Sequence, residues 1–121
     1  MKLAQSKNVS EKIVNKKGKV FYEEIFAGII EENEDGYIFT YSENYIKLPN
    51  TKPISLTMPL TSTPYISKTM FPFFDGLIPE GWLIDIAEKN WKINQRDRME
   101  LLLTFCENCI GSVSVIPFNK D

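Results

Sequence analysis

Side chains that commonly carry out catalysis are scarce in this sequence of 121 residues, and histidine is absent. Without histidine there is no Ser-His-Asp or Cys-His arrangement, no imidazole metal ligand and not the commonest general base. The two cysteines, Cys106 and Cys109, form one CxxC at the end of a helical pattern. A redox thiol is favoured at the start of a helix, and a zinc site needs two further ligands. We therefore interpret the pair as two small residues near a helix end.

Phosphate-binding and acid–base motifs are missing as well. The six glycines are scattered, and none stands in a GxGxxG or GxxxxGK frame. Asp75 and Glu80 are close in sequence, but a helix break separates them, so we expect a solvent-facing charge and an acid in the first turn of a helix. Arg96 and Arg98 flank Asp97 and are expected to form a surface ion network. The residues thus indicate a domain without an active site, cofactor or metal.

Length and charge define the organisation of the chain. With 43% hydrophobic and 25% charged residues, the sequence is typical of one globular domain. No signal peptide is visible and no apolar run approaches the roughly 20 residues of a membrane helix, so we expect a cytoplasmic protein. Six lysines lie within residues 1–19, and we expect 1–18 to be a basic, flexible leader and 19–121 the domain. The acidic remainder would repel phosphate.

The hydrophobic pattern predicts strands mainly in the N-terminal half. A tight turn at Glu23-Glu24 and a second turn at Asn33–Gly36 separate the first three. Strict alternation in PISLTMPL indicates a half-buried edge strand, because its two prolines cannot donate to a ladder. Residues 61–67 are expected to form a polar loop. The predicted strands are Lys19–Tyr22, Ile25–Glu32, Tyr37–Tyr41, Pro53–Leu60 and Gly111–Pro117.

Helical spacing dominates the C-terminal half. One helix is predicted over Phe71–Ile78 and a second from about Glu80 or Trp82 to Asn90. A third is predicted after Asp97, an N-cap with Glu100 at capping-box spacing. Its inner face is expected to carry Met99, Leu102, Leu103 and Cys106. The fold class is therefore α+β. We expect a small antiparallel sheet, or a partly closed barrel, of about 4–6 strands with about three helices in the C-terminal half.

The stretch MFPFFDGLIPEGW, residues 70–82, concentrates aromatic residues, prolines and glycines. Apolar residues at helical spacing usually form core. Trp82 follows a Pro-Glu-Gly turn, and tryptophan is a frequent interface anchor. Trp82 therefore has two interpretations, a core residue or the anchor of a partner interface.

Six segments together resemble a known family. They are VFYEEIFAGII, YIFTYSENYI, PISLTMPL, FPFFDGLIPEGW, DRMELLLTF and IGSVSVIP, and in order and spacing they cover residues 19–117. PxSLxxPL followed by FFDxLxPEG is the most specific combination. The chain resembles the N-terminal subdomain of HipA-type serine/threonine kinases, the toxins of bacterial toxin–antitoxin systems.

The resemblance implies a function through a partner. In HipA-type kinases the ATP-binding loop and the catalytic and metal-binding aspartates lie beyond this subdomain, so this chain is not expected to be an enzyme. The resemblance points to the split HipB–HipS–HipT arrangement, in which a HipS-like antitoxin neutralises a HipT-like kinase and a HipB-like protein binds DNA. A detached subdomain would expose an apolar patch. We expect the kinase interface to include Phe74, Asp75, Pro79, Glu80, Gly81 and Trp82.

Two other functions remain open at this point. The chain could be an activating subunit that completes a split HipA-like kinase, with the same partner and the opposite effect. Alternatively, it could be an accessory protein that contacts nucleic acid through its lysine-rich N-terminus. The first is distinguished by co-expression toxicity, and the second by steeply salt-dependent binding that requires residues 1–18.

Overall fold

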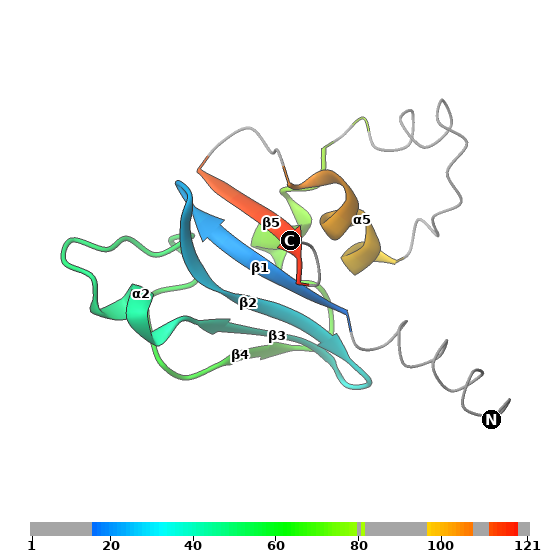
Figure 1. Cartoon of the computed structure of the whole chain (residues 1–121). Helices are drawn as coiled ribbons and strands as arrows, with labels where there is room; N and C mark the ends of the chain where they lie inside the picture. Colours follow the sequence, from blue (N-terminus) through cyan, green and yellow to red (C-terminus); the bar gives the residue numbers. More distant parts are fainter. Residues whose placement is uncertain (1–15, 80, 82–96, 108–111, 119–121) are drawn as a thin grey trace, which may run out of the picture.

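The computed structural model describes residues 16–79, 81, 97–107 and 112–118 (Figure 1). In this part of the chain five antiparallel strands form one open sheet in the order β4-β3-β2-β1-β5. The strands are β1 (Lys17–Tyr22), β2 (Ile25–Asn33), β3 (Gly36–Tyr41), β4 (Tyr65–Ser67) and β5 (Val113–Pro117). The described helices are α2 (Glu43–Lys47), α3 (Pro72–Asp75) and α5 (Arg98–Phe105). The α+β prediction is confirmed, and the sheet does not close into a barrel.

A tight hairpin joins β1 and β2 at the predicted position. Glu23 and Glu24 both adopt positive φ, 48° and 73°, as the two-residue turn that suits the twist of a hairpin requires. The Glu23 N–H donates to the Ser112 carbonyl at 2.7 Å, which ties the turn to the chain just before β5. β1 begins at Lys17, so the sheet starts two residues before the expected domain boundary.

A β-bulge sets which side chains of β2 face outward. The register of the β1–β2 pair shifts between Val20 and Phe21, which leaves Ala27 as an extra residue on β2. Ala27 is buried, whereas Ile25 and Phe26 on the turn side of the bulge are exposed. The bulge therefore places two large apolar side chains at the solvent near the hairpin end.

The core lies between the sheet and the two later helices. α3 and α5 contact each other on the same side of the sheet (Figure 1). The rings of Phe39 on β3 and Phe74 on α3 lie 5.4 Å apart, a contact that adds about 0.5–1.5 kcal/mol beyond area burial. α5 approaches β1 where Gly18 has no side chain, since a Cβ there would lie 2.7 Å from the Leu103 Cδ2.

α5 forms as its sequence predicts. The Asp97 carboxylate accepts a hydrogen bond from the Glu100 N–H at 3.0 Å, so Asp97 is the N-cap. Leu101, which is not among the residues that the spacing predicts on the inner face, is fully buried, whereas Leu103 is only partly buried. The inner face of the helix therefore extends further round its axis than the pattern indicated.

The prediction of a strand over Pro53–Leu60 is wrong. The segment folds back on itself, with a single bridge between Ser55 and Met58. The Ser55 hydroxyl accepts from the Thr57 N–H at 3.1 Å, a local bond that competes with a ladder. Ile54 and Met58 are buried, but Leu56 at the tip of the turn is 94% exposed. The predicted burial of every second residue therefore holds for Ile54 and Met58 and does not hold for Leu56.

Other expectations for this half of the chain are met in part. Within the expected polar loop, Tyr65–Ser67 forms the edge strand β4. The helix predicted over residues 71–78 is shorter, because α3 ends at Asp75 and single turns follow to Ile78. The second predicted helix, near 82–90, lies outside the described residues.

Candidate partner-binding surface

The six residues expected at a kinase interface differ in their exposure to solvent. Phe74 is completely buried between α3 and β3, so it belongs to the core and has no surface for a partner. Asp75 is partly exposed, and Pro79 and Gly81 are exposed. A Cβ at Gly81 would meet no atom within 4 Å, so the chain is open to solvent there. Glu80 and Trp82 lie outside the described residues.

Asp75 joins α3 to α5. Its carboxylate accepts from the Arg98 Nε at 2.6 Å, and both side chains remain partly exposed. Of the residues expected in a surface ion network, Arg98 reaches Asp75 across the helix pair and Asp97 pairs with Lys16. Arg96 lies outside the described residues. An exposed pair of this kind contributes at most about 1 kcal/mol.

A groove of about 470 Å³ opens beside this segment. Its walls come from the end of β1, the folded 53–56 turn, α3 with the turn after it, and the start of β5. The apolar lining residues are Tyr22, Pro53, Ile54, Leu56, Phe73, Leu77 and Val113. Leu77 belongs both to the groove and to the segment between Asp75 and Pro79, so the two surfaces are continuous. We call this feature the hairpin groove.

A smaller hollow of about 170 Å³ shares Tyr22 and Lys52 with the hairpin groove. Ile25 and Leu48 line it, and both are exposed large apolar side chains. Together with Leu56, three of the six exposed large apolar residues of the described chain line these two adjoining hollows. Exposed apolar residues concentrated in one place indicate an interaction surface, whereas scattered ones do not.

One tyrosine hydroxyl holds the far wall of the groove in place. The Ile54 N–H donates to Tyr41 Oη at 3.0 Å, and this hydroxyl donates to the Met58 carbonyl. Burial raises the pKa of Tyr41 to about 12. Burial, with the nearby Tyr22 and Glu23, also raises the pKa of Tyr45. Both phenols therefore stay neutral at physiological pH and serve as fixed hydrogen-bonding groups.

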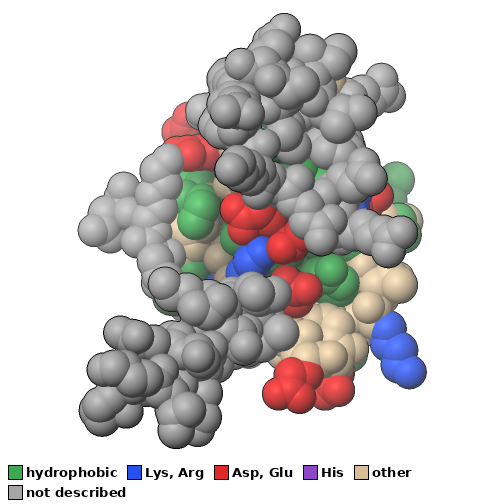
Figure 2. Space-filling view, turned by 90° about the vertical axis from the view of Figure 1, so that its right-hand side faces the viewer, with side chains coloured by type: hydrophobic (Ala, Val, Ile, Leu, Met, Phe, Trp, Pro, Cys, Tyr) green, Lys and Arg blue, Asp and Glu red, His purple; other side chains and the backbone are tan. Residues whose placement is uncertain are grey.

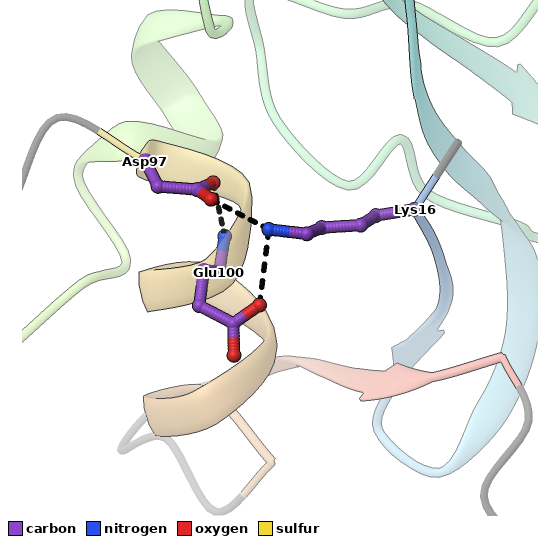
Figure 3. Close-up of polar contacts among 3 residues, drawn as sticks. All are labelled: Lys16, Asp97 and Glu100. Carbon is purple, nitrogen blue, oxygen red and sulfur yellow. Dashed lines mark hydrogen bonds and ion pairs between the residues drawn. The ribbon is translucent and has the colours of Figure 1, made fainter. Parts of the chain in front are cut away.

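A second polar cluster lies on another face. Lys16 Nζ contacts Asp97 Oδ2 at 2.6 Å and Glu100 Oε1 at 3.0 Å, which clamps the start of β1 to the first turn of α5 (Figure 3). Figure 2 shows acidic side chains gathered around basic ones on the face that carries α5. Burial acts to lower the pKa of Lys16, but the bonds to the two carboxylates outweigh it and raise the pKa. Burial, with the charge of Asp97, raises the pKa of Glu32, whose Oε1 is buried without a hydrogen bond among the described residues.

The described residues offer little for catalysis. No group of three His, Cys, Asp or Glu side chains suited to a metal is found among them. Cys106 is buried at the C-cap of α5, and its Sγ donates to the Leu77 carbonyl at 3.3 Å, while Cys109 lies outside the described part. None of the helices in the described ranges is long and apolar enough to cross a bilayer. Fold and surface together define an α+β domain with an open, largely apolar groove.

The comparisons with known proteins assign the domain to a family. The HipA N-terminal domain family matches residues 18–116. The solved structure of the N-terminal domain of HipA toxin matches with a TM-score of 0.68 and 34% identity, over 88% of this chain and 95% of that one. The chain therefore belongs to the HipA N-terminal domain family, as the sequence resemblance predicted, and the match does not include a kinase catalytic domain.

Two relatives show the domain in proteins of different length. An uncharacterised protein of Haemophilus influenzae is 36% identical over 98 residues, which is 81% of this chain and 89% of that protein. The putative kinase Y4mE of Sinorhizobium fredii is 34% identical over 103 residues, 84% of this chain. This chain spans only 24% of the length of Y4mE. The domain thus makes up most of one relative and about a quarter of the other.

Sequence reasoning missed most of the groove. Leu56 was expected on the half-buried face of a strand, and Leu48 was expected to anchor its loop to the body, whereas both are exposed. Ile25 was not singled out. The Glu23-Glu24 pair was recognised as a turn but not as part of a surface. The signal available was that two acidic residues occupy turn positions where Asn and Gly are favoured.

Proposed function

We infer that this chain is a HipS-like, antitoxin-type regulatory protein that binds and neutralises a HipT-like serine/threonine kinase, and that it is not itself an enzyme. The observation that carries the proposal is the distribution of the domain. It is about a quarter of a putative kinase in one relative and nearly all of a small protein in another. A domain used in both ways is suited to act on a separate kinase chain.

The exposed apolar surface supports a protein partner. Leu56, Ile25 and Leu48 lie around one end of the sheet, beside a groove with largely apolar lining. In a fused kinase such a surface can be covered by the rest of the chain, whereas a separate domain needs a partner to cover it. We propose that the kinase covers it in the cytoplasm, and that a HipB-like DNA-binding protein joins through the kinase.

The contact is proposed to extend along the segment that follows α3. Asp75, Pro79 and Gly81 are its described surface residues. We propose that Glu80 and Trp82, which lie outside the described residues, also contact the kinase, with Trp82 as the anchor. Phe74 does not contact the partner in this account, because it is buried. Its role is to fix α3 against the sheet, and so to fix the start of the segment.

A nucleic-acid function through the leader is less well supported. Lys16 is paired with Asp97 and Glu100, and Lys17 Nζ lies 4.0 Å from Glu31 Oε1. These described lysines are thus engaged within the domain. The alternative that keeps the kinase as partner is an activating subunit.

Co-expression separates inhibitor from activator. The kinase gene is induced in growing cells with this protein, without it, and with a Phe74→Asp variant whose core cannot form as a matched control. The proposal predicts that the wild-type protein relieves growth arrest and that the Phe74→Asp variant does not. Deeper arrest with the wild-type protein would establish the activating subunit, and unchanged arrest would contradict both.

A further inference from the structure

We propose that the hairpin groove and the Glu23-Glu24 turn at its end form one docking site, occupied by a kinase segment that places an apolar side chain in the groove and a lysine or arginine against the turn. The inference rests on the proposed function, since it names the surface through which that partner binds. The occupant is a segment of the kinase, and a second copy of this chain is the competing occupant.

The apolar part of the site is built by side chains that the fold does not bury. Leu56 is 94% exposed although the residues two positions to each side, Ile54 and Met58, are buried. The Tyr41 hydroxyl holds both flanks, so the turn presents Leu56 on a fixed base. Phe73 and Leu77 form the opposite wall and are only partly buried. A preformed apolar groove of this kind accepts an anchor side chain at low entropic cost.

The negative charge of the Glu23-Glu24 turn indicates which kind of side chain the partner places there. Glu23 and Glu24 are exposed and form no ion pair with any residue that the structure describes. Glu23 lines the hollow that adjoins the groove, and its N–H bond to Ser112 fixes it beside the start of β5. Lys52 is the basic residue of both linings, and it forms no ion pair with Glu23 within the described part of the chain. A basic side chain of the partner therefore fits at the hairpin, next to the apolar anchor.

The relatives explain why a kinase is the occupant. In Y4mE the matched domain is 24% of the chain, so about three-quarters of that putative kinase is available to cover such a surface. The backbone at the turn is consistent with a binding role. Positive φ favours Gly or Asn, yet both positions hold glutamate. The two glutamates therefore lower the stability of the turn relative to Gly or Asn.

The test compares two surface changes with two matched controls. Leu56→Ser removes the exposed apolar side chain of the groove, and Ile66→Ser removes one that is 73% exposed on β4. Glu23→Asn with Glu24→Gly removes two charges at one hairpin, and Glu34→Gln with Asp35→Asn removes two at the turn on the opposite end of β2. Each protein is titrated into the purified kinase by calorimetry at two salt concentrations, and its thermal midpoint is measured.

The proposal predicts that Leu56→Ser weakens kinase binding by about tenfold or more while Ile66→Ser leaves it unchanged. The Glu23/Glu24 variant is expected to bind several-fold more weakly, with a smaller salt dependence, although its melting temperature rises by about 4–8 °C from the relieved turn. The Glu34/Asp35 variant is expected to keep the wild-type affinity.

Three results would overturn the proposal, and each points elsewhere. Equal affinity of the groove variants and their controls would place the interface outside the groove and leave the proposed function standing. A wild-type dimer in light scattering that Leu56→Ser dissociates, with kinase affinity unchanged, would make a second copy the occupant. Failure of the wild-type protein to bind the kinase would remove the proposed function together with this site.

Discussion

At the scale of single residues, the Tyr41 hydroxyl has an unusually large role. It accepts from the Ile54 N–H and donates to the Met58 carbonyl, so one side chain satisfies two buried backbone groups of a segment that makes no ladder. This segment carries Leu56. The position of an exposed side chain on the candidate surface is thereby fixed by a buried phenol.

Tyr41→Phe is expected to lower the free energy of unfolding by about 1–3 kcal/mol, because a buried N–H and carbonyl lose their partner. Urea denaturation measures this change, and Tyr65→Phe is a suitable control, since its hydroxyl bonds the Pro59 carbonyl in an exposed position. A cost no larger than that of the control would show that the phenol does not hold the turn.

The same phenol gives a pH prediction. The pKa of Tyr41 is raised in the folded state from 10.0 to about 12, so the unfolded chain loses this proton first as the pH rises. The stabilisation is complete below pH 10 and is lost between about pH 10 and 12. Denaturation across this range should show a smaller loss of stability for Tyr41→Phe than for the wild type. Parallel curves would contradict the assignment.

Trp82 is tested at the same scale. If it anchors the kinase, Trp82→Ala should weaken binding by about 2 kcal/mol or more and leave the thermal midpoint nearly unchanged. Calorimetric titration of the kinase together with a thermal melt measures both quantities. A large fall in the midpoint with unchanged intrinsic affinity would assign Trp82 to the core.

At the scale of elements, contacts with the start of β1 and with α3 hold α5 in place. Asp97 caps the helix through the Glu100 N–H and also pairs with Lys16, and Leu103 packs where Gly18 leaves room. The helix thereby joins β1 to α3, which it reaches through Arg98 and Asp75.

Two substitutions separate the cap from the ion pair. Asp97→Ala removes both and is expected to cost about 1–2 kcal/mol of folding free energy, whereas Asp97→Asn keeps a capping oxygen and should cost less. Chemical denaturation of the two variants gives the comparison. Equal losses would mean that the charge on Asp97, and not its cap, holds the helix.

The elements that sequence predicted are those with local causes. The Glu23-Glu24 hairpin and the Asp97 cap depend on residues close in sequence, and both form as expected. The strand predicted over residues 53–60 does not form. The hydrogen bond of Ile54 to the distant Tyr41 and the bond between Ser55 and Thr57 outweigh the alternating pattern. The groove was beyond prediction for the same reason, since its walls come from four separate parts of the chain.

At the scale of the whole molecule, the candidate surface and the charged cluster lie on different parts of the domain. Lys16, which binds Asp97 and Glu100, lines neither the hairpin groove nor the hollow beside it. The account places partner binding on the hairpin groove and the segment that follows α3, and not on the leader. Removal of residues 1–15 keeps Lys16, so it should leave kinase affinity unchanged in a pull-down titration. Loss of affinity on this truncation would show that the leader binds the partner.

The most direct test of the central claim is to recover the partner with this protein from its native cell extract and to assay the recovered kinase. Autophosphorylation is measured as increasing amounts of the purified protein are added. The account predicts that a HipA-type kinase is recovered and that its rate falls to a low plateau as this protein saturates it. A rate that rises on addition, or the absence of a kinase from the recovered material, would contradict the antitoxin function.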